Sequence, residues 1–367
     1  MIATHWFQIL TALVMGASAA HAREVQPPLE WKTECVGRME VKLPGDVELA
    51  ALLPAGLQKE FKGAASAPAY AFRDGEKASQ TMFYYGGLLF VTHELDASSQ
   101  MKFRRSAFSW QKEMSDIVNK EHKKNTDGTP MVFENLQTEQ SGPLGWRVDE
   151  SYIAYLDVGK SSVLWKMTGR PEIVPRIRHD YQSLTAAAVA RETFSVPPSP
   201  GVCLPYIFLK DDGQTHRTIA MSYRLKAHPD VTIWLEDASA ASFQDQEREE
   251  RLSPAYRIAD FWGQYIHVDE KSTSLWNLPG MRSIAMNGKK GLASFVKITR
   301  SDKSEDFGYF AVVRGVAGST QESPDLRLLV VRNSAKAHAK NISPIDEKAF
   351  LQIAEGITSS VKSRSTH

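Results

Sequence analysis

Residues 195–201 read Ser-Val-Pro-Pro-Ser-Pro-Gly and divide the chain into two halves of similar length. Three of these seven residues are prolines. Proline stiffens the backbone and cannot donate a hydrogen bond within a helix or a central strand. The segment is therefore predicted to be a linker. It assigns residues 23–195 to an N-terminal domain, 196–201 to the linker and 202–367 to a C-terminal domain.

The two halves follow the same order of segments. Each opens shortly before a cysteine that heads an apolar stretch, CVGRMEVKLP from Cys35 and CLPYIFL from Cys203. Each then contains a G-x-x-G element, at residues 142–145 and 288–291, followed by strand-like segments and a closing helix. Because the order is shared but the residue identities are not, the pattern is interpreted as an ancient duplication.

Apolar residues at spacings of three and four predict helices in both halves. One helix is expected over about residues 99–121, and a shorter, more polar counterpart around 241–252. Each half closes with a further helix, and Ser343 followed by Pro344 is a start signal for the last one. The apolar stripes of the three longer helices are Phe103, Ala107, Trp110, Met114 and Ile117; Ile177, Tyr181, Leu184 and Ala188; and Phe350, Ile353, Ile357 and Val361.

Strands are predicted most clearly in the second half. Apolar and more polar residues alternate over 218–225 and again over 231–236, which is typical of a sheet with one face buried. His228-Pro229-Asp230 between them is a turn signal. The fold class is therefore α+β: two similar domains, each a mostly antiparallel sheet packed with helices that cover one of its faces.

The N-terminus carries an export signal. Residues 6–20 form an apolar run that is too short for a membrane-spanning helix, and Ala20-His21-Ala22 fits a signal-peptidase site. Residues 1–22 are therefore predicted to be a signal peptide, with Arg23 beginning the mature, periplasmic chain. An uncleaved segment anchored in the membrane is the alternative, because the region before the apolar run lacks Lys and Arg.

Composition and motifs exclude several classes of protein. The 367 residues include 44 Lys and Arg against 43 Asp and Glu, which is not the basic excess expected of a nucleic-acid binder. The chain has no G-x-S-x-G elbow, no HExxH motif, no P-loop and no dinucleotide-binding glycine motif. We expect no enzyme activity, no catalytic residues, no metal and no cofactor.

The two cysteines, Cys35 and Cys203, occupy matching positions at the start of each half. In an oxidising compartment they could form one disulfide. They could equally be two buried, reduced thiols, since sequence alone does not show whether their Cα atoms lie within disulfide reach. Both alternatives stay open at this stage.

Several short motifs resemble a family of type VI secretion immunity proteins. The first half has Trp31-Lys32-Thr33-Glu34-Cys35-Val36-Gly37-Arg38 and then Leu43-Pro44; the second has Gly201-Val202-Cys203-Leu204 and His228-Pro229-Asp230-Val231. Residues 39–42, Met-Glu-Val-Lys, depart from the more apolar strand usual in that family. The resemblance implies a two-domain periplasmic protein that neutralises a secreted lipase (phospholipase) effector, and it identifies no contact residues.

The resemblance also implies a mechanism. The two domains would clamp the lipase and prevent its lid from opening at the membrane, so that the closed, inactive state is favoured. The expected partner is the cognate lipase, with no nucleic acid and no stable insertion into the membrane after signal cleavage. The alternative is a periplasmic binding module for a small ligand or a cell-envelope protein, which a parallel, doubly wound fold would favour.

Overall fold

The computed structural model describes residues 30–61, 69–136, 142–268, 272–274, 280–318 and 323–364. The predicted signal peptide, residues 1–22, and its cleavage site before Arg23 lie outside these ranges. The signal peptide therefore stays a prediction.

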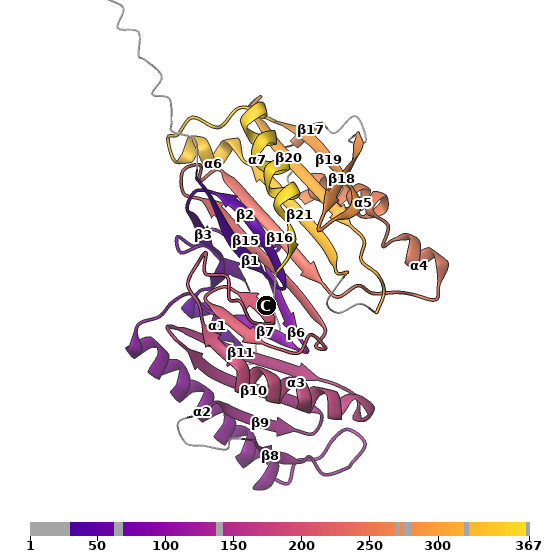
Figure 1. Cartoon of the computed structure of the whole chain (residues 1–367). Coiled ribbons are helices and arrows are strands. Elements are labelled where there is room, and N and C mark those ends of the chain that lie inside the picture. The colour runs from indigo at the N-terminus through magenta and orange to yellow at the C-terminus, as the bar shows by residue number, and fades with distance from the viewer. Residues whose placement is uncertain are drawn as a thin grey trace, which may run out of the picture.

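One antiparallel sheet of 14 strands runs through both halves of the described chain (Figure 1). We define a first lobe, residues 82–187, and a second lobe, residues 217–360. The strands of the first lobe are β6 (Met82–Tyr85), β7 (Leu88–Val91), β8 (Phe133–Asn135), β9 (Leu144–Val148), β10 (Ser151–Val158) and β11 (Ser161–Thr168). Those of the second lobe are β15 (Arg217–Leu225), β16 (Val231–Ala238), β17 (Ser272–Ser274), β18 (Met281–Met286), β19 (Lys289–Arg300), β20 (Glu305–Val313) and β21 (Asp325–Arg332).

The two lobes have the same strand order. In space the first lobe is ordered β6-β7-β11-β10-β9 and the second β15-β16-β21-β20-β19, and β6 pairs with β15 where the lobes meet. Every pairing between the named strands is antiparallel, which confirms the α+β class with antiparallel sheets. The sheet is continuous across the lobes, so the division into two domains and the duplication remain predictions.

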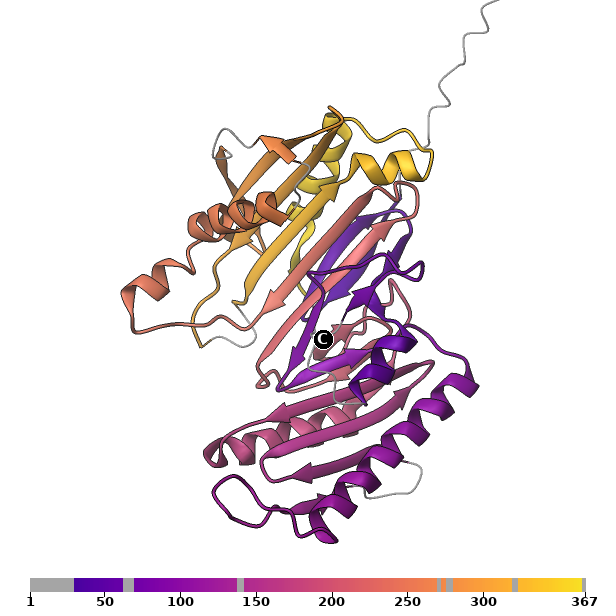
Figure 2. The ribbon, with the colours of Figure 1, turned by 180° about the vertical axis from the view of Figure 1, so that it is seen from behind.

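Helices cover both faces of each lobe, so the expectation of one covered face is wrong. In β10, Tyr155 contacts Phe61 at the end of α1, while Tyr152, on the opposite face, contacts Tyr181 of α3. Figure 1 shows α3 and α7 in front of the sheet, and the reverse view shows α2 and α5 (Figure 2). The helices are α1 (Pro54–Glu60), α2 (Ala97–Asn119), α3 (Val174–Ala187), α4 (Gln246–Glu250), α5 (Pro254–Val268), α6 (Ser334–Ala339) and α7 (Glu347–Ser360), with a 3-10 turn at Pro171–Ile173.

The helix boundaries confirm most predictions and correct two. The 99–121 helix exists as α2, with the Asp96 side chain accepting from the Ser99 amide at its N-terminus. The last helix begins later than predicted, because Asp346, rather than Ser343, caps it by accepting from the Ala349 amide. The polar helix expected around 241–252 shrinks to α4, and the longer α5 behind it was not predicted.

The α5 helix exists because it packs an aromatic face on the sheet. Pro254 begins it, as proline does in a first helical turn. Phe261 stacks on Phe310 of β20 at 4.4 Å between ring centroids, and the Trp262 indole donates to Ser294 of β19. On the other face of β20, Phe307 contacts Phe350 of α7 at 5.6 Å.

Two short hairpins pack across the lobes, each with a strand from the far side of the linker. The first hairpin, residues 31–44, is β1 (Trp31–Val36) and β2 (Met39–Pro44), and it pairs with β22 (Lys362–Ser363) just after α7. The second hairpin, residues 201–210, is β13 (Gly201–Leu204) and β14 (Ile207–Lys210), and it pairs with β12 (Ala188–Ala190) just after α3. The strand β3 (Val47–Leu49) pairs with β15 and is the fourteenth strand of the large sheet, and β4 (Ala51–Leu52) pairs with β5 (Tyr70–Ala71).

Candidate functional site

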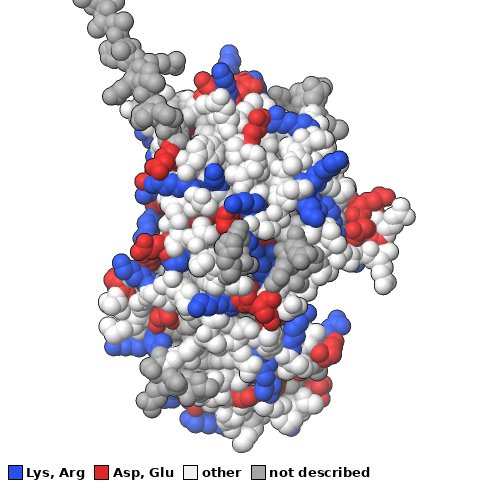
Figure 3. All heavy atoms as spheres, viewed as in Figure 1, with Lys and Arg blue, Asp and Glu red and all other residues white. Residues whose placement is uncertain are grey.

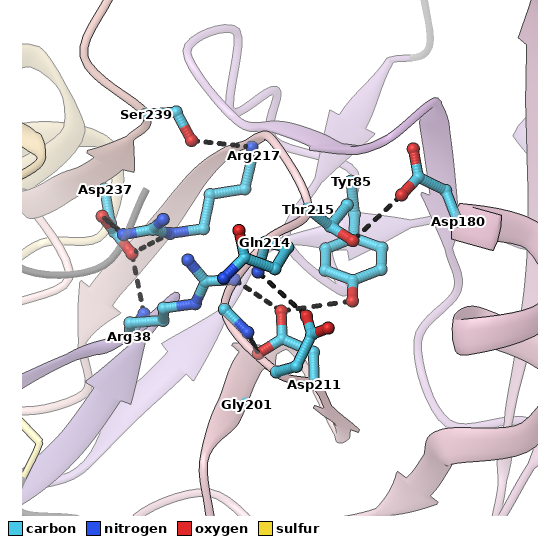
Figure 4. A network of polar contacts seen from close by, with 12 residues as sticks. Arg38, Tyr85, Asp180, Gly201, Asp211, Gln214, Thr215, Arg217, Asp237 and Ser239 are labelled. Carbon is cyan, nitrogen blue, oxygen red and sulfur yellow. Dashed lines mark hydrogen bonds and ion pairs between the residues drawn. The ribbon is translucent and has the colours of Figure 1, made fainter. Parts of the chain in front are cut away.

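A buried polar network lies where the two lobes and the hairpins meet (Figure 4). Asp237 of β16 is fully buried and accepts from Arg217 of β15 through two guanidinium nitrogens, at 2.7 and 2.6 Å. The same carboxylate accepts from the Arg38 backbone amide at 2.7 Å, at the turn of the first hairpin. Asp237 therefore fastens the first hairpin to β15 and β16, the strands of the second lobe that lie nearest the first lobe.

The network continues into the first lobe. The Arg38 guanidinium pairs with Asp211 at 2.5 Å, and the Tyr85 phenol of β6 donates to the same carboxylate at 3.2 Å. Thr215 donates to Asp180 of α3 at 3.0 Å. Burial raises the pKa of the Tyr85 phenol, which keeps it protonated and able to donate.

These buried pairs link the two lobes and the first hairpin. A buried ion pair adds little net stability compared with apolar side chains of similar volume in its place. Breaking the pair by removing one partner is costly, which disfavours other arrangements of the same residues. Within the described ranges, no group of three or more His, Cys, Asp or Glu side chains could hold a metal ion.

A floor between the lobes is formed by residues that share one face of four neighbouring strands. The register aligns Tyr84 of β6, Thr218 of β15, Ala238 of β16 and Asp325 of β21 in one row. With strands about 4.8 Å apart, the row spans about 14 Å. Tyr84 and Thr218 are partly exposed, whereas Ala238 and Asp325 are buried.

The two ends of this row differ in their surroundings. Tyr84 is half-buried, its phenol donates to the Met167 sulfur of β11 at 3.9 Å, and burial raises the pKa of that phenol. At the other end, Asp325 pairs with Arg257 of α5 at 2.9 Å and with Arg314 at 2.8 Å. The wall of the second lobe is therefore formed by α5 and Arg314, whereas α3 of the first lobe packs on the opposite face of the sheet, against Trp165.

The wall of the second lobe presents exposed aromatic side chains. Phe243 precedes α4 and Tyr256 lies in the first turn of α5, and both are 44% exposed. Arg314 also pairs with Glu249 at 3.1 Å and so ties α4 to the sheet. Figure 3 shows the outline of the molecule notched between α4 above and the first lobe below. We call this floor, with the wall of the second lobe and the indentation that the first lobe bounds, the notch.

A second exposed surface lies on α2, away from the notch. A groove of about 620 Å³ runs between α1 and α2, and Phe61, Lys102, Arg105 and Trp110 are among its lining residues. Phe108, on the same helix, is 55% exposed. This surface combines apolar and basic side chains without the two-sided geometry of the notch.

The structure brings together the two cysteines that the sequence singled out. Cys35 and Cys203 are fully buried, their Cα atoms are 5.8 Å apart, and their sulfur atoms are bonded. Whether the bond forms in the exported protein stays a prediction. Sequence reasoning missed the notch residues Tyr84, Phe243 and Tyr256, because their proximity depends on which strands pair. None of the described helices is long and apolar enough to cross a membrane.

Comparison with protein families identifies the C-terminal half. Residues 195–366 match the family model described as the Tle cognate immunity protein 4 C-terminal domain. The resemblance seen in the sequence is thereby confirmed for that half. No curated protein matches the chain.

Solved structures extend the likeness of fold over nearly the whole chain. The apo structure of the immunity protein TplEi of the type VI secretion system from Pseudomonas aeruginosa aligns with a TM-score of 0.57 at 13% identity, covering 92% of this chain and 98% of that one. The structure of the Tle4–Tli4 complex gives a TM-score of 0.58 at 13% identity, with coverages of 92% and 98%. TplEi complexed with the "L" peptide gives 0.54 at 14% identity, with coverages of 92% and 99%.

Proposed function

We propose, taking as premise the match of residues 195–366 to the Tle cognate immunity protein 4 family, that this chain is an immunity protein of the type VI secretion system. Its partner is a secreted lipase (phospholipase) effector. The family match is the observation that carries the proposal, and the likeness of fold to a protein solved in a complex with Tle4 supports it.

The notch is the proposed contact surface for the effector. Aromatic side chains contribute strongly to the binding energy of protein interfaces, and the notch presents Phe243 and Tyr256 beside its floor. A partner seated there touches both lobes. The buried network at Arg38, Asp211 and Asp237 holds the lobes at a fixed angle, so little ordering is required on binding.

Inhibition in this proposal needs no chemistry from the inhibitor. Binding only the closed form of the lipase shifts its lid equilibrium toward the inactive state. The chain acts in the periplasm after removal of residues 1–22, and it has no catalytic turnover of its own. The antiparallel sheet speaks against the rival binding module, which a parallel, doubly wound fold would favour.

The first experiment measures inhibition directly. The mature protein, from Arg23, is titrated into the lipase encoded beside its gene, with a phospholipid substrate. We expect activity to fall linearly to zero at a fixed molar ratio, and the protein alone to release no fatty acid. Failure to co-purify with that lipase and to inhibit it would refute the proposed function.

A matched pair of phenylalanines tests the location of the contact. Phe243→Ala removes an exposed ring from the notch, whereas Phe108→Ala removes an exposed ring from α2. A central aromatic anchor contributes about 2 kcal/mol or more, which is about a 30-fold rise in Kd. We expect that rise for Phe243→Ala and an unchanged Kd for Phe108→Ala, measured by calorimetry. The reverse ranking would move the contact surface to α2.

A further inference from the structure

The two lobes are joined by a reciprocal exchange of hairpins. The first hairpin, from the start of the chain, ends on the second lobe, where the Arg364 amide donates to the Arg38 carbonyl at 3.2 Å. The second hairpin, which follows the linker, ends on the first lobe, where the Arg191 amide donates to the Tyr206 carbonyl at 2.9 Å. Each lobe is therefore completed by a strand pair from the opposite side of the linker.

The disulfide lies where the two exchanged hairpins touch. Gly37 and Cys203 form a two-way backbone bridge, with amide-to-carbonyl distances of 3.0 and 2.8 Å. Cys35, two residues before Gly37, is bonded to Cys203 across a sequence separation of 168 residues. The only covalent cross-link that this chain can form, since it has two cysteines, thus ties one exchanged hairpin to the other.

Buried charged groups fill the space around this bond. Glu34 is fully buried and accepts from the Arg191 guanidinium at 2.7 Å. Arg191 and Arg364 both donate to linker carbonyls, at Ser195 at 3.3 Å and Pro197 at 3.0 Å respectively. The segment from Ser195 to Pro197 is therefore held by Arg191, which follows β12, and by Arg364, which follows β22. Separation of the hairpins would break these contacts together.

We propose that the Cys35–Cys203 bond is a redox latch: in its oxidised form it holds the two exchanged hairpins together. Forming it removes one hydrogen atom from each thiol, so two protons and two electrons pass to a disulfide-bearing oxidant, which leaves as two thiols. Once it is formed, both hairpins are held on their opposite lobes. We call the region where the two hairpins contact each other and the lobes the junction. In the reduced chain the junction opens locally at both hairpins, while the lobes stay folded.

The experiment compares amide hydrogen exchange in the oxidised and reduced forms of the full mature chain. Because both sulfur atoms are buried, reduction is done in denaturant, followed by refolding in reductant. With two cysteines in the chain, the reductant acts on this bond alone. The probes are the amides of Gly37, Cys203, Arg191 and Arg364, each of which donates across the junction. The control amides lie at the centres of β10 and β20.

We expect purified periplasmic protein to contain no free thiol. In the reduced form, the four probe amides should exchange at least about ten-fold faster, while the control amides keep their rates. Reoxidation should restore all four. The Cys35→Ser/Cys203→Ser variant should match the reduced form. If the reduced chain does not refold at all, the lobes themselves depend on the bond, and the proposal of a local latch is refuted.

Three further outcomes would overturn the proposal. These are free thiols in the exported protein, unchanged probe amides after reduction, or faster exchange at one hairpin or throughout the chain instead of at both hairpins. The measurement needs no effector, so its result is independent of the proposed function.

Discussion

Removing the carboxylate of Glu34 tests how the junction is held. Glu34 is fully buried in β1 and accepts three hydrogen bonds, from the Arg191 guanidinium at 2.7 Å, the Cys35 amide at 2.7 Å and the Phe194 amide at 2.6 Å. Glu34→Ala leaves the guanidinium of Arg191, which is 7% exposed, without its counter-charge. It also deprives two amides of their acceptor.

The magnitude follows from burial. Breaking a buried ion pair by removing one partner costs about 3–5 kcal/mol, and an amide left without an acceptor costs about 1–3 kcal/mol more when water cannot reach it. These costs are not additive, so we expect the free energy of unfolding to fall by about 3–5 kcal/mol. Glu34→Gln should lower the free energy of unfolding by most of this amount, since glutamine keeps the shape of the side chain but not its charge.

The same strand offers the control. Lys32, two residues earlier in β1, pairs with Asp46 at 2.7 Å, but both side chains are exposed. Water and salt screen such a pair, so Asp46→Ala should leave the unfolding midpoint unchanged. The assay is urea unfolding followed by tryptophan fluorescence without reductant, with the disulfide checked by mass. Equal midpoints for Glu34→Ala and Asp46→Ala would refute the argument.

Three further predictions rest on other parts of the fold. Gly37 and Gly75 both have positive φ, but a Cβ at Gly37 would lie 2.2 Å from an Asp237 oxygen while one at Gly75 meets nothing within 4 Å. Gly37→Ala should therefore destabilise the chain by about 1–3 kcal/mol more than Gly75→Ala in urea unfolding, and equal effects would contradict the packing. Asp230 is buried with no hydrogen-bond partner on either carboxylate oxygen among the described residues, and burial raises its pKa above 3.8. A carboxyl group with a raised pKa favours folding at low pH, and that contribution is lost as pH rises through the folded-state pKa. Asp230→Asn should therefore stabilise the protein more at pH 7 than at pH 3. The same difference in stability between variant and parent at both pH values would argue against this. Residues 23–195 and 201–367 made as separate chains should each fold incompletely, since each lacks the hairpin that completes its lobe, and should co-elute as a folded pair when expressed together. A single half that folds and binds the lipase as tightly as the whole chain would show that neither the exchange nor the two-sided grip is needed.

The sequence by itself determined the local elements. Apolar spacing placed α2, α3 and α7, and alternation placed β15 and β16, because each of these signals depends on residues close together in the chain. The sequence also contained a signal against a sheet that helices cover on one face only. Residues Tyr152–Leu156 of β10 form a continuous apolar run, and all five are buried. Such runs are typical of strands covered on both faces.

Tertiary structure decided which distant elements meet. The pairing of β6 with β15, the exchange of the two hairpins and the row from Tyr84 to Asp325 join residues far apart in sequence. Backbone hydrogen bonds between strands are the same whatever the side chains, so the sequence of one strand does not determine which strand it pairs with. Which strands pair depends on burying the apolar faces of all the elements together. The notch and the contacts of Glu34 at the junction can therefore be seen only in the folded structure.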